Sequence, residues 1–309
     1  MAVDLSPIDE SLLAEIANIH GMPKGAFNIR RDGKLVERHS SANIEISTKT
    51  DVPGIDITIA PGTKGETVYI PVIVTQSGLK DVVYNTFYIG EDCDVTIVAG
   101  CGIHNASHQA AEHDGIHTFH LGKNSRMKYV EKHYGEGEGT GERILNPVTT
   151  VEMAENSYCE MEMVQLRGVT STVRDTDAVL QAGAKLVLTE KLLTHDAQQA
   201  TSNMKIELKG DDSSVQVISR SVAQDDSYQV FNPLVIGEAK CRGHVQCDAI
   251  IMGNAKVKAI PGIEAASEDA QLIHEAAIGK IAGDQIVKLM TLGLTEEEAE
   301  QEILDDFLN

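Results

Sequence analysis

Tryptophan is absent from this 309-residue chain, and aromatic residues make up only 4% of it. No run of 18 apolar residues occurs, so we expect no membrane-spanning helix. Basic residues are scarce, because 26 Lys and Arg stand against 47 Asp and Glu, which gives a net charge of −21. A nucleic-acid-binding protein needs a basic face to displace the counterions of phosphates. We therefore expect neither a nucleic-acid partner nor a membrane.

The sequence also lacks a secretory signal and the common catalytic motifs, which bears on the location and the activity of the protein. The N-terminal stretch MAVDLSPIDE lacks the basic-then-apolar pattern of a secretory signal, and the five cysteines are odd in number. This predicts reduced thiols and a cytoplasmic location rather than a disulfide framework. The sequence also lacks Gly-x-Ser-x-Gly, His-Glu-x-x-His, dinucleotide-binding and Walker motifs. We expect that the chain is not an enzyme and does not hydrolyse ATP itself.

A short signature recurs through the middle of the chain. It consists of a small residue, a polar or small turn and then alternating apolar positions, and five copies begin 27 to 32 residues apart. Repeats of this length without helical segments between them predict a mainly β fold built as a parallel β-helix. A β-sandwich is the alternative, because such turns also join the strands of sandwiches. The copies begin at Gly90, Gly122, Ala154, Gln181 and Gly210.

Helical and hairpin patterns are confined to the two ends of the chain. A helix is predicted over 6–20, followed by a hairpin over 28–47 that turns at Asp32-Gly33. Helical spacing is read over 270–292, and Thr295 with Glu298 forms a capping box for a last helix. We expect these terminal helices to cap the open ends of the coil. The division is an N-terminal segment 1–40, a β-helix core 41–262 and a C-terminal helical segment 263–309.

A histidine-rich run offers one candidate metal site. It contains Cys101, His104 and His108, and it continues to His120. Thiolate and imidazole groups suit zinc, iron or iron–sulfur chemistry. On a strand, however, His104 and His108 would lie about 13 Å apart, which is too far for one ion. Exposed polar positions on a sheet or loop are the competing interpretation.

A second group of reactive side chains lies where the strand pattern gives way to helical spacing. Cys247 lies in the last strand-like segment, and His274 and Glu275 follow within thirty residues. On a helix, these two neighbours would point about 100° apart, so they would not pair directly. Taken alone, Cys247 is as well explained as a small buried apolar residue.

The C-terminal stretch resembles the SufB/SufD family of iron–sulfur cluster assembly proteins. Over roughly 239–307 the matching segments follow one another closely and in the same order as in the family. The strand-rich middle shares the family's strand content but little of its sequence. One departure stands before the glycine of the C-terminal helix pair, where the family often has Arg and this chain has Leu292. The matching segments are Cys247-Asp-Ala-Ile-Ile-Met-Gly253, Ala259-Ile-Pro-Gly-Ile-Glu-Ala265, Leu272-Ile-His-Glu-Ala-Ala-Ile-Gly-Lys-Ile281 and Gly293-Leu-Thr-Glu-Glu-Glu-Ala299.

The resemblance implies a right-handed parallel β-helix flanked by small N- and C-terminal helical segments. It also implies pairing as a homodimer or as a SufB/SufD-type heterodimer, with the C-terminal helices docking a SufC-like ABC ATPase. Such a complex is a scaffold of the SUF system, where a transient iron–sulfur cluster is built from a sulfur donor and passed to apo-protein acceptors. Carried over to this chain, Cys247, His274 and Glu275 would be the cluster ligands at the dimer interface.

Three functions remain open at this point. The first is the assembly scaffold, in which Cys247 binds iron or accepts sulfide. The second is a SufD-like structural adaptor that presents the ATPase-docking helices and holds no cluster. The third is a metal-dependent enzyme that uses the Cys101–His120 run. The iron–sulfur cluster is the cofactor that the first function implies.

Overall fold

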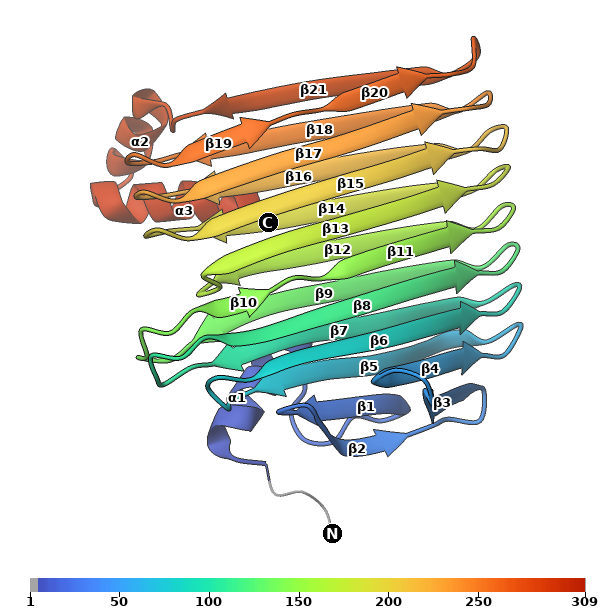
Figure 1. The fold of residues 1–309 in the computed structure, drawn as a ribbon. Helices are drawn as coiled ribbons and strands as arrows, with labels where there is room; N and C mark the ends of the chain where they lie inside the picture. The colour runs from blue at the N-terminus through green and yellow to red at the C-terminus, as the bar shows by residue number, and fades with distance from the viewer. Residues whose placement is uncertain (1–4, 309) are drawn as a thin grey trace.

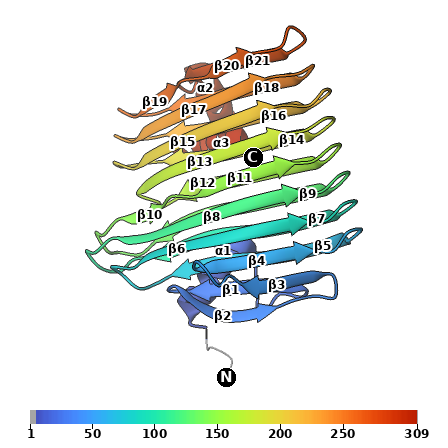
Figure 2. The ribbon, with the colours of Figure 1, turned by 45° about the vertical axis from the view of Figure 1, so that its right-hand side comes forward.

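The structure is a computed structural model that describes residues 5–308, so residues 1–4 of the expected N-terminal segment and residue 309 of the C-terminal segment lie outside it. Two long sheets stack coil upon coil into a parallel β-helix of about eight turns (Figure 1). Figure 2 shows the same stack from β2 at one end to β21 at the other. Parallel neighbours throughout the coil exclude the sandwich, because its sheets are antiparallel.

Sheet A has ten strands and sheet B has eleven, and the chain alternates between them through most of the coil. Sheet A contains β1 (Ala26–Arg31), β2 (Lys34–His39), β5 (Lys64–Val74), β7 (Asp94–His104), β9 (Arg126–Glu136), β12 (Tyr158–Arg167), β14 (Lys185–Thr194), β16 (Ser214–Ala223), β18 (Arg242–Ile251) and β21 (Gln271–Gly279). Sheet B contains β3 (Ile44–Thr48), β4 (Gly54–Ile59), β6 (Lys80–Ile89), β8 (Ala111–Leu121), β10 (Arg143–Leu145), β11 (Val148–Met153), β13 (Ser171–Leu180), β15 (Gln199–Leu208), β17 (Tyr228–Gly237), β19 (Lys256–Ala259) and β20 (Gly262–Ala265).

The recurring signature is confirmed as the turn that begins five successive strands of sheet A, namely β7, β9, β12, β14 and β16. Its third residue has a left-handed backbone, with φ of 56° at Asp92, 56° at Asn124 and 59° at Asn156, a conformation that Asp, Asn and Gly tolerate best. The next residue is small and points inward, and Ser125 and Ser157 each donate a 2.7 Å hydrogen bond to the carbonyl three residues earlier. Each turn thus satisfies its own buried polar groups and restarts the coil in register.

The N-terminal helix α1 (Pro7–Ala17) begins with the expected cap at Ser6 and ends three residues before the expected stop, at Asn18 in a left-handed conformation. It packs on the outer face of sheet A rather than over the end of the coil. Gly100 permits this approach, because a Cβ there would lie 2.6 Å from the carbonyl oxygen of Ile16. The hairpin turns at Asp32-Gly33 as predicted, but it ends at His39, since β3 pairs with β4 instead.

The predicted helix over 270–292 is wrong in its first half. Residues Gln271–Gly279 form β21, which extends sheet A beside β18, and only Gly283–Met290 are helical, as α2. Helix α3 (Glu296–Leu308) carries the predicted capping box, in which the Thr295 and Glu298 side chains bond each other's backbone N–H. Leu304 and Leu308 pack beside Val222 on the flank of the coil. The expected cap over the coil end is therefore missing, and β21 remains the outer strand of sheet A.

Candidate functional site

Cys247 lies in β18 near the open end of the coil and faces the interior. Its side chain is almost fully buried, and its backbone neighbours across the sheet are Ser219 in β16 and Ala276 in β21. This inward direction follows from the strand alternation, since every second residue of β18 is buried. The interior position gives the thiol a sheltered environment close to the last strand.

His274 and Glu275 lie on a strand, which corrects the expected helical placement and changes their geometry. Successive strand residues point to opposite faces, so the two side chains project from opposite faces of sheet A. His274 faces inward beside Val245, and its Nε2 is buried without a hydrogen-bond partner among residues 5–308. Glu275 faces outward and accepts a 2.9 Å hydrogen bond from His244 Nε2. Cys247 and His274 thus share a face, and Glu275 does not.

The thiol of Cys247 is protonated at neutral pH in the isolated chain. Burial, together with the negative charges of Asp248 and Glu190, raises its pKa to about 11. A thiol in such a setting becomes a thiolate ligand when a cation arrives, because a bound metal displaces the proton. The site is therefore suited to receiving a metal ion rather than to attacking an electrophile unaided.

The strands around this site form an exposed apolar edge. β21 ends sheet A, and β19 and β20 lie at the same end of sheet B. Ile273 on β21 is 61% exposed and Ile263 on β20 is 48% exposed. An unpaired strand edge with exposed branched side chains is a surface for pairing with another chain. Figure 1 shows this edge clear of the C-terminal helices.

The histidine-rich run does not form the site that its spacing offered. His104 ends β7 on the outer side, where its Nδ1 lies 3.2 Å from Glu136, and His108 is exposed in the following loop. Cys101 instead faces the interior. The structure therefore separates Cys101 from both His104 and His108, so these three residues do not share one site.

Cys101 meets two other histidines in the interior. His133 is its backbone neighbour on β9, and His113 approaches from β8 while its Nδ1 contacts Asp81 at 3.1 Å. Burial alone would raise the pKa of the Cys101 thiol, but the charge of His113 and contacts with His133 lower it to about 7. Burial likewise opposes a charged His113, but Cys101 and Asp81 raise its pKa to about 10. His113 Nε2 lacks a well-formed hydrogen bond among the described residues, so its effect on the thiol is mainly electrostatic.

A buried ionic network continues from this pocket along the interior. Arg174 of β13 crosses from sheet B to form ion pairs with Glu131 of β9 and, at 3.6 Å, with Glu190 of β14. Burial would raise the pKa of Glu131, but the charges of Arg174 and His133 hold it well below its usual value. Burial raises the pKa of Glu190, and Arg174 only partly opposes that effect.

The network and Cys247 share one interior column of sheet A. Glu131, Met163, Glu190, Ser219 and Cys247 are successive backbone neighbours across four strand pairs. Beside them, a cavity of about 10 Å³ adjoins Arg174 and Glu190, which is room for a single water molecule. A polar layer therefore runs from the Cys101 pocket toward Cys247.

Sequence reasoning missed this layer, although a signal for it existed. His133 follows Cys101 by one coil length, and Glu131 precedes Met163 by the same interval. Aligning the repeats by coil would have placed these residues in interior columns. The missed residues are Asp81, Glu131, His133, Arg174 and Glu190, whereas His113 lies within the histidine-rich run already singled out.

Comparison with known proteins gives a consistent result. Residues 74–307 match the family model described as SUF system FeS cluster assembly, SufBD core domain. An iron–sulfur cluster assembly SufBD family protein of Archaeoglobus fulgidus is 26% identical over 277 residues, covering 89% of this chain and 73% of its own length. Relatives with the same description are 24% identical in Methanocaldococcus jannaschii, over 93% of this chain and 90% of that protein, and 27% identical in Pyrococcus horikoshii, over 89% and 80%. Within residues 5–308, no helix is long and apolar enough to cross a bilayer.

Proposed function

Because the chain belongs to the SufBD family of iron–sulfur cluster assembly proteins, we propose that it is a scaffold on which a nascent cluster is built where two chains meet. The cluster is cargo in this proposal, to be passed to apo-protein acceptors after a sulfur donor has supplied sulfide. The observation that carries the proposal is that Cys247 and His274 face one interior on β18 and β21, and that the outer edge of β21 pairs with no other described strand.

A second chain supplies the remaining part of the site. β21 offers its free edge and the exposed Ile273, so a homodimer or a SufB/SufD-type heterodimer would form by edge pairing. The buried Nε2 of His274 lacks a partner among the described residues, which leaves a nitrogen ligand available at this junction. Mixed nitrogen, oxygen and sulfur ligation suits a scaffold, because four thiolates would hold a cluster too firmly for release.

Glu275 joins this ligand set only if β21 moves. In the isolated chain, it points away from Cys247 and contacts His244. β21 runs through a three-residue link into α2, so a force on α2 would be transmitted to the strand that holds both His274 and Glu275. We propose that β21 has two positions, one with Glu275 facing away from Cys247 and one with Glu275 near it. Docking of the ATPase partner would shift the equilibrium between these two positions.

The docking surface in this proposal is α2. None of its residues is buried, Val287 is 60% exposed, and the following Leu292 is 74% exposed. An apolar helix face without a partner is a typical docking element. We propose an ABC-type ATPase of the SufC kind as its partner, so that ATP is hydrolysed there, in the cytoplasm, while this chain is not itself an enzyme.

The adaptor function remains as a second candidate, and one observation favours it. The Cys247 thiol is buried and its pKa is raised, while Glu275 lies on the other face. An adaptor would need only the coil and the C-terminal helices, without any change at these residues.

Anaerobic reconstitution with ferrous iron and sulfide tests the proposal, with the ATPase partner and ATP present. Iron content and visible absorption per dimer would be compared for the wild type, Cys247→Ser, Glu275→Ala and Cys101→Ser. Loss of the cluster in Cys247→Ser, with the dimer intact, is the expected result. Full cluster loading in Cys247→Ser would refute the scaffold site, and an empty wild type would favour the adaptor.

A further inference from the structure

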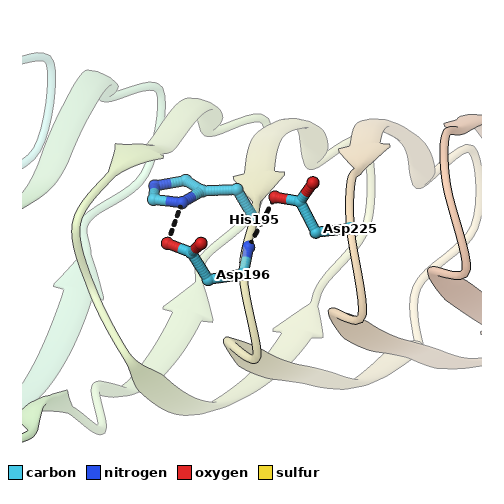
Figure 3. A group of neighbouring side chains, drawn as sticks. All are labelled: His195, Asp196 and Asp225. Carbon is cyan, nitrogen blue, oxygen red and sulfur yellow. Dashed lines mark hydrogen bonds and ion pairs between the residues drawn. The ribbon is translucent and has the colours of Figure 1, made fainter.

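A group of metal-ligating side chains lies on the outside of the coil, away from the candidate cluster site. His195 and Asp196 belong to the turn after β14, and Asp225 belongs to the equivalent turn after β16 (Figure 3). One ligand atom from each residue lies within 4.8 Å of the others. The Nδ1 of His195 is 2.8 Å from Asp196 Oδ2, and the Asp196 backbone N–H donates a 2.8 Å hydrogen bond to Asp225 Oδ2.

This pair of turns differs from other neighbouring turns of the coil. The carboxylate of Asp92 accepts a 3.2 Å hydrogen bond from the amide of Asn124. Asp212 lies 3.5 Å from the ammonium group of Lys240. Here, by contrast, two carboxylates adjoin an imidazole, and the ionic partner of Asp196 is His195, which is not a permanent cation. Adjacent carboxylates with so little positive charge between them attract a cation.

The backbone holds these groups in fixed positions. Asp196 and Asp225 have left-handed φ values of 52° and 58°. The turns are tied together by a 3.0 Å hydrogen bond from Asp226 N–H to the Asp196 carbonyl, and β14 and β16 are paired along their full length. The ligand atoms therefore need little reorganisation to converge on one ion.

We propose that His195, Asp196 and Asp225 bind one divalent first-row transition-metal ion on the outer surface of the coil. An imidazole beside carboxylates favours zinc or ferrous iron over magnesium and calcium, which prefer oxygen ligands alone. Asp196 is 79% exposed and His195 is 33% exposed, so water completes the coordination shell. Nδ1 and Oδ2 are 2.8 Å apart and need to separate only slightly to become neighbouring ligands of one tetrahedral ion, which lie about 3.3 Å apart.

Binding changes the protonation of one ring nitrogen. In the metal-free chain, Nδ1–H donates to Asp196, and Nε2 accepts from the Gln198 amide at 3.2 Å. The metal takes the Nδ1 lone pair, so a neutral ring must carry its proton on Nε2. The Gln198 NH2 group opposes that tautomer, whereas its Oε1 accepts the His195 backbone N–H. Gln198→Glu would offer an acceptor to both groups, as carboxylates do behind many metal-bound histidines.

The site stands independently of the proposed cluster assembly, because it involves neither the interior thiols nor β21. A metal here would join two consecutive coils across their turns. It would therefore raise the stability of the coil, since a ligand that binds the folded state alone shifts the unfolding equilibrium.

Calorimetric titration of the full chain with zinc chloride tests the proposal, with magnesium chloride as the comparison ion. The wild type should bind one more zinc equivalent than His195→Gln or Asp225→Asn, or bind that equivalent at least tenfold more tightly. Asp212→Asn is the matched control, because it removes the same charge from the same kind of left-handed turn. It should bind zinc as the wild type does.

Two further readouts separate a built site from general attraction of cations. Gln198→Glu should tighten zinc binding but leave magnesium binding weak, and zinc should raise the melting temperature of the wild type more than that of Asp225→Asn. Equal zinc binding by the wild type, His195→Gln and Asp225→Asn would overturn the proposal. So would equal losses in Asp225→Asn and Asp212→Asn, because these would reflect net charge alone.

Discussion

Arg174 reaches from sheet B across the interior of the coil to pair with Glu131 on sheet A. Both side chains are at least 95% buried, and the same guanidinium lies 3.6 Å from Glu190. One cation thus lies between two buried carboxyl groups, and Tyr129 donates a 3.0 Å hydrogen bond to Glu131 as well. The pair links the two walls of the coil at a point where the interior is polar instead of apolar.

Replacing Arg174 should therefore be costly. Arg174→Met leaves two buried carboxylates without their cation, and we expect a loss of about 3–5 kcal/mol in the free energy of unfolding. Denaturation in urea measures it. The triple variant Arg174→Met, Glu131→Gln, Glu190→Gln removes the uncompensated charges and should regain more than half of the loss. If the triple variant is as unstable as Arg174→Met, the loss of stability comes from altered packing and not from the uncompensated charges.

The thiol groups of Cys101 and Cys247 should titrate far apart. We expect deprotonation near pH 7 for Cys101 and near pH 11 for Cys247, because the first adjoins imidazolium groups and the second adjoins carboxylates. Carbon-13 chemical shifts of labelled cysteine measure both values. His113→Gln should raise the pKa of Cys101 and leave that of Cys247 unchanged. A single common transition would contradict the assignment.

The same pair should shape the dependence of stability on pH. The lowered pKa of Cys101 contributes stability that is complete above its ordinary value of 9.0 and is lost as the pH falls through about 7. The raised pKa of His113 contributes stability that is complete below 6.5 and is lost as the pH rises through about 10. Compared with Cys101→Ser, the wild type should lose stability as the pH falls from 9 to 7. Parallel stability curves for the two proteins would refute the charged pair.

Disrupting the open edge should prevent pairing without unfolding the chain. Ile273→Lys places a charge on β21, and we expect at least a tenfold weaker dimer by sedimentation, because an edge lysine opposes strand pairing. Ile8→Lys serves as the control, since Ile8 is also an exposed isoleucine but lies on α1, remote from the edge. An unchanged dimer in Ile273→Lys would place the interface elsewhere.

The exposed face of α2 should decide ATPase binding. Val287→Asp adds a charge to that face and should weaken binding of the cognate ABC-type ATPase at least tenfold, as measured by calorimetry. Leu35→Asp makes the same kind of change at an exposed position on β2. If both variants weaken ATPase binding to a similar extent, the effect is one of added charge in general. If neither variant weakens it, α2 is not the docking surface.

Local chemistry made the coil predictable from the sequence. Left-handed turns need Asp, Asn or Gly, and these recur at Asp92, Asn124 and Asn156 with one coil between them. The cap at Ser6 and the box at Thr295 with Glu298 are likewise set by neighbours in sequence. Such signals depend on few residues and are not overridden by tertiary contacts.

The parts that were missed depend on distant contacts. β21 was predicted as a helix because Ile273, Ala277 and Ile281 have helical spacing, yet pairing with β18 makes it a strand. The ionic network was missed because alternating polar residues in a strand usually face water, and only the closed coil turns Glu131 and Arg174 inward. The positions of Cys247 and His274 on one face followed once β21 was seen as a strand.

Two of the five cysteines occupy the inward position directly before a strand of sheet A, Cys93 before β7 and Cys241 before β18. Cys93 and Cys241 occupy the same inward position as the serines at 125, 157 and 213 in neighbouring coils. Cys159 lies in the apolar core, where burial raises its pKa. Neighbouring coils thus show which residues fit these positions, and serine at 93 and 241 with alanine at 159 would leave two thiol groups, those of Cys101 and Cys247.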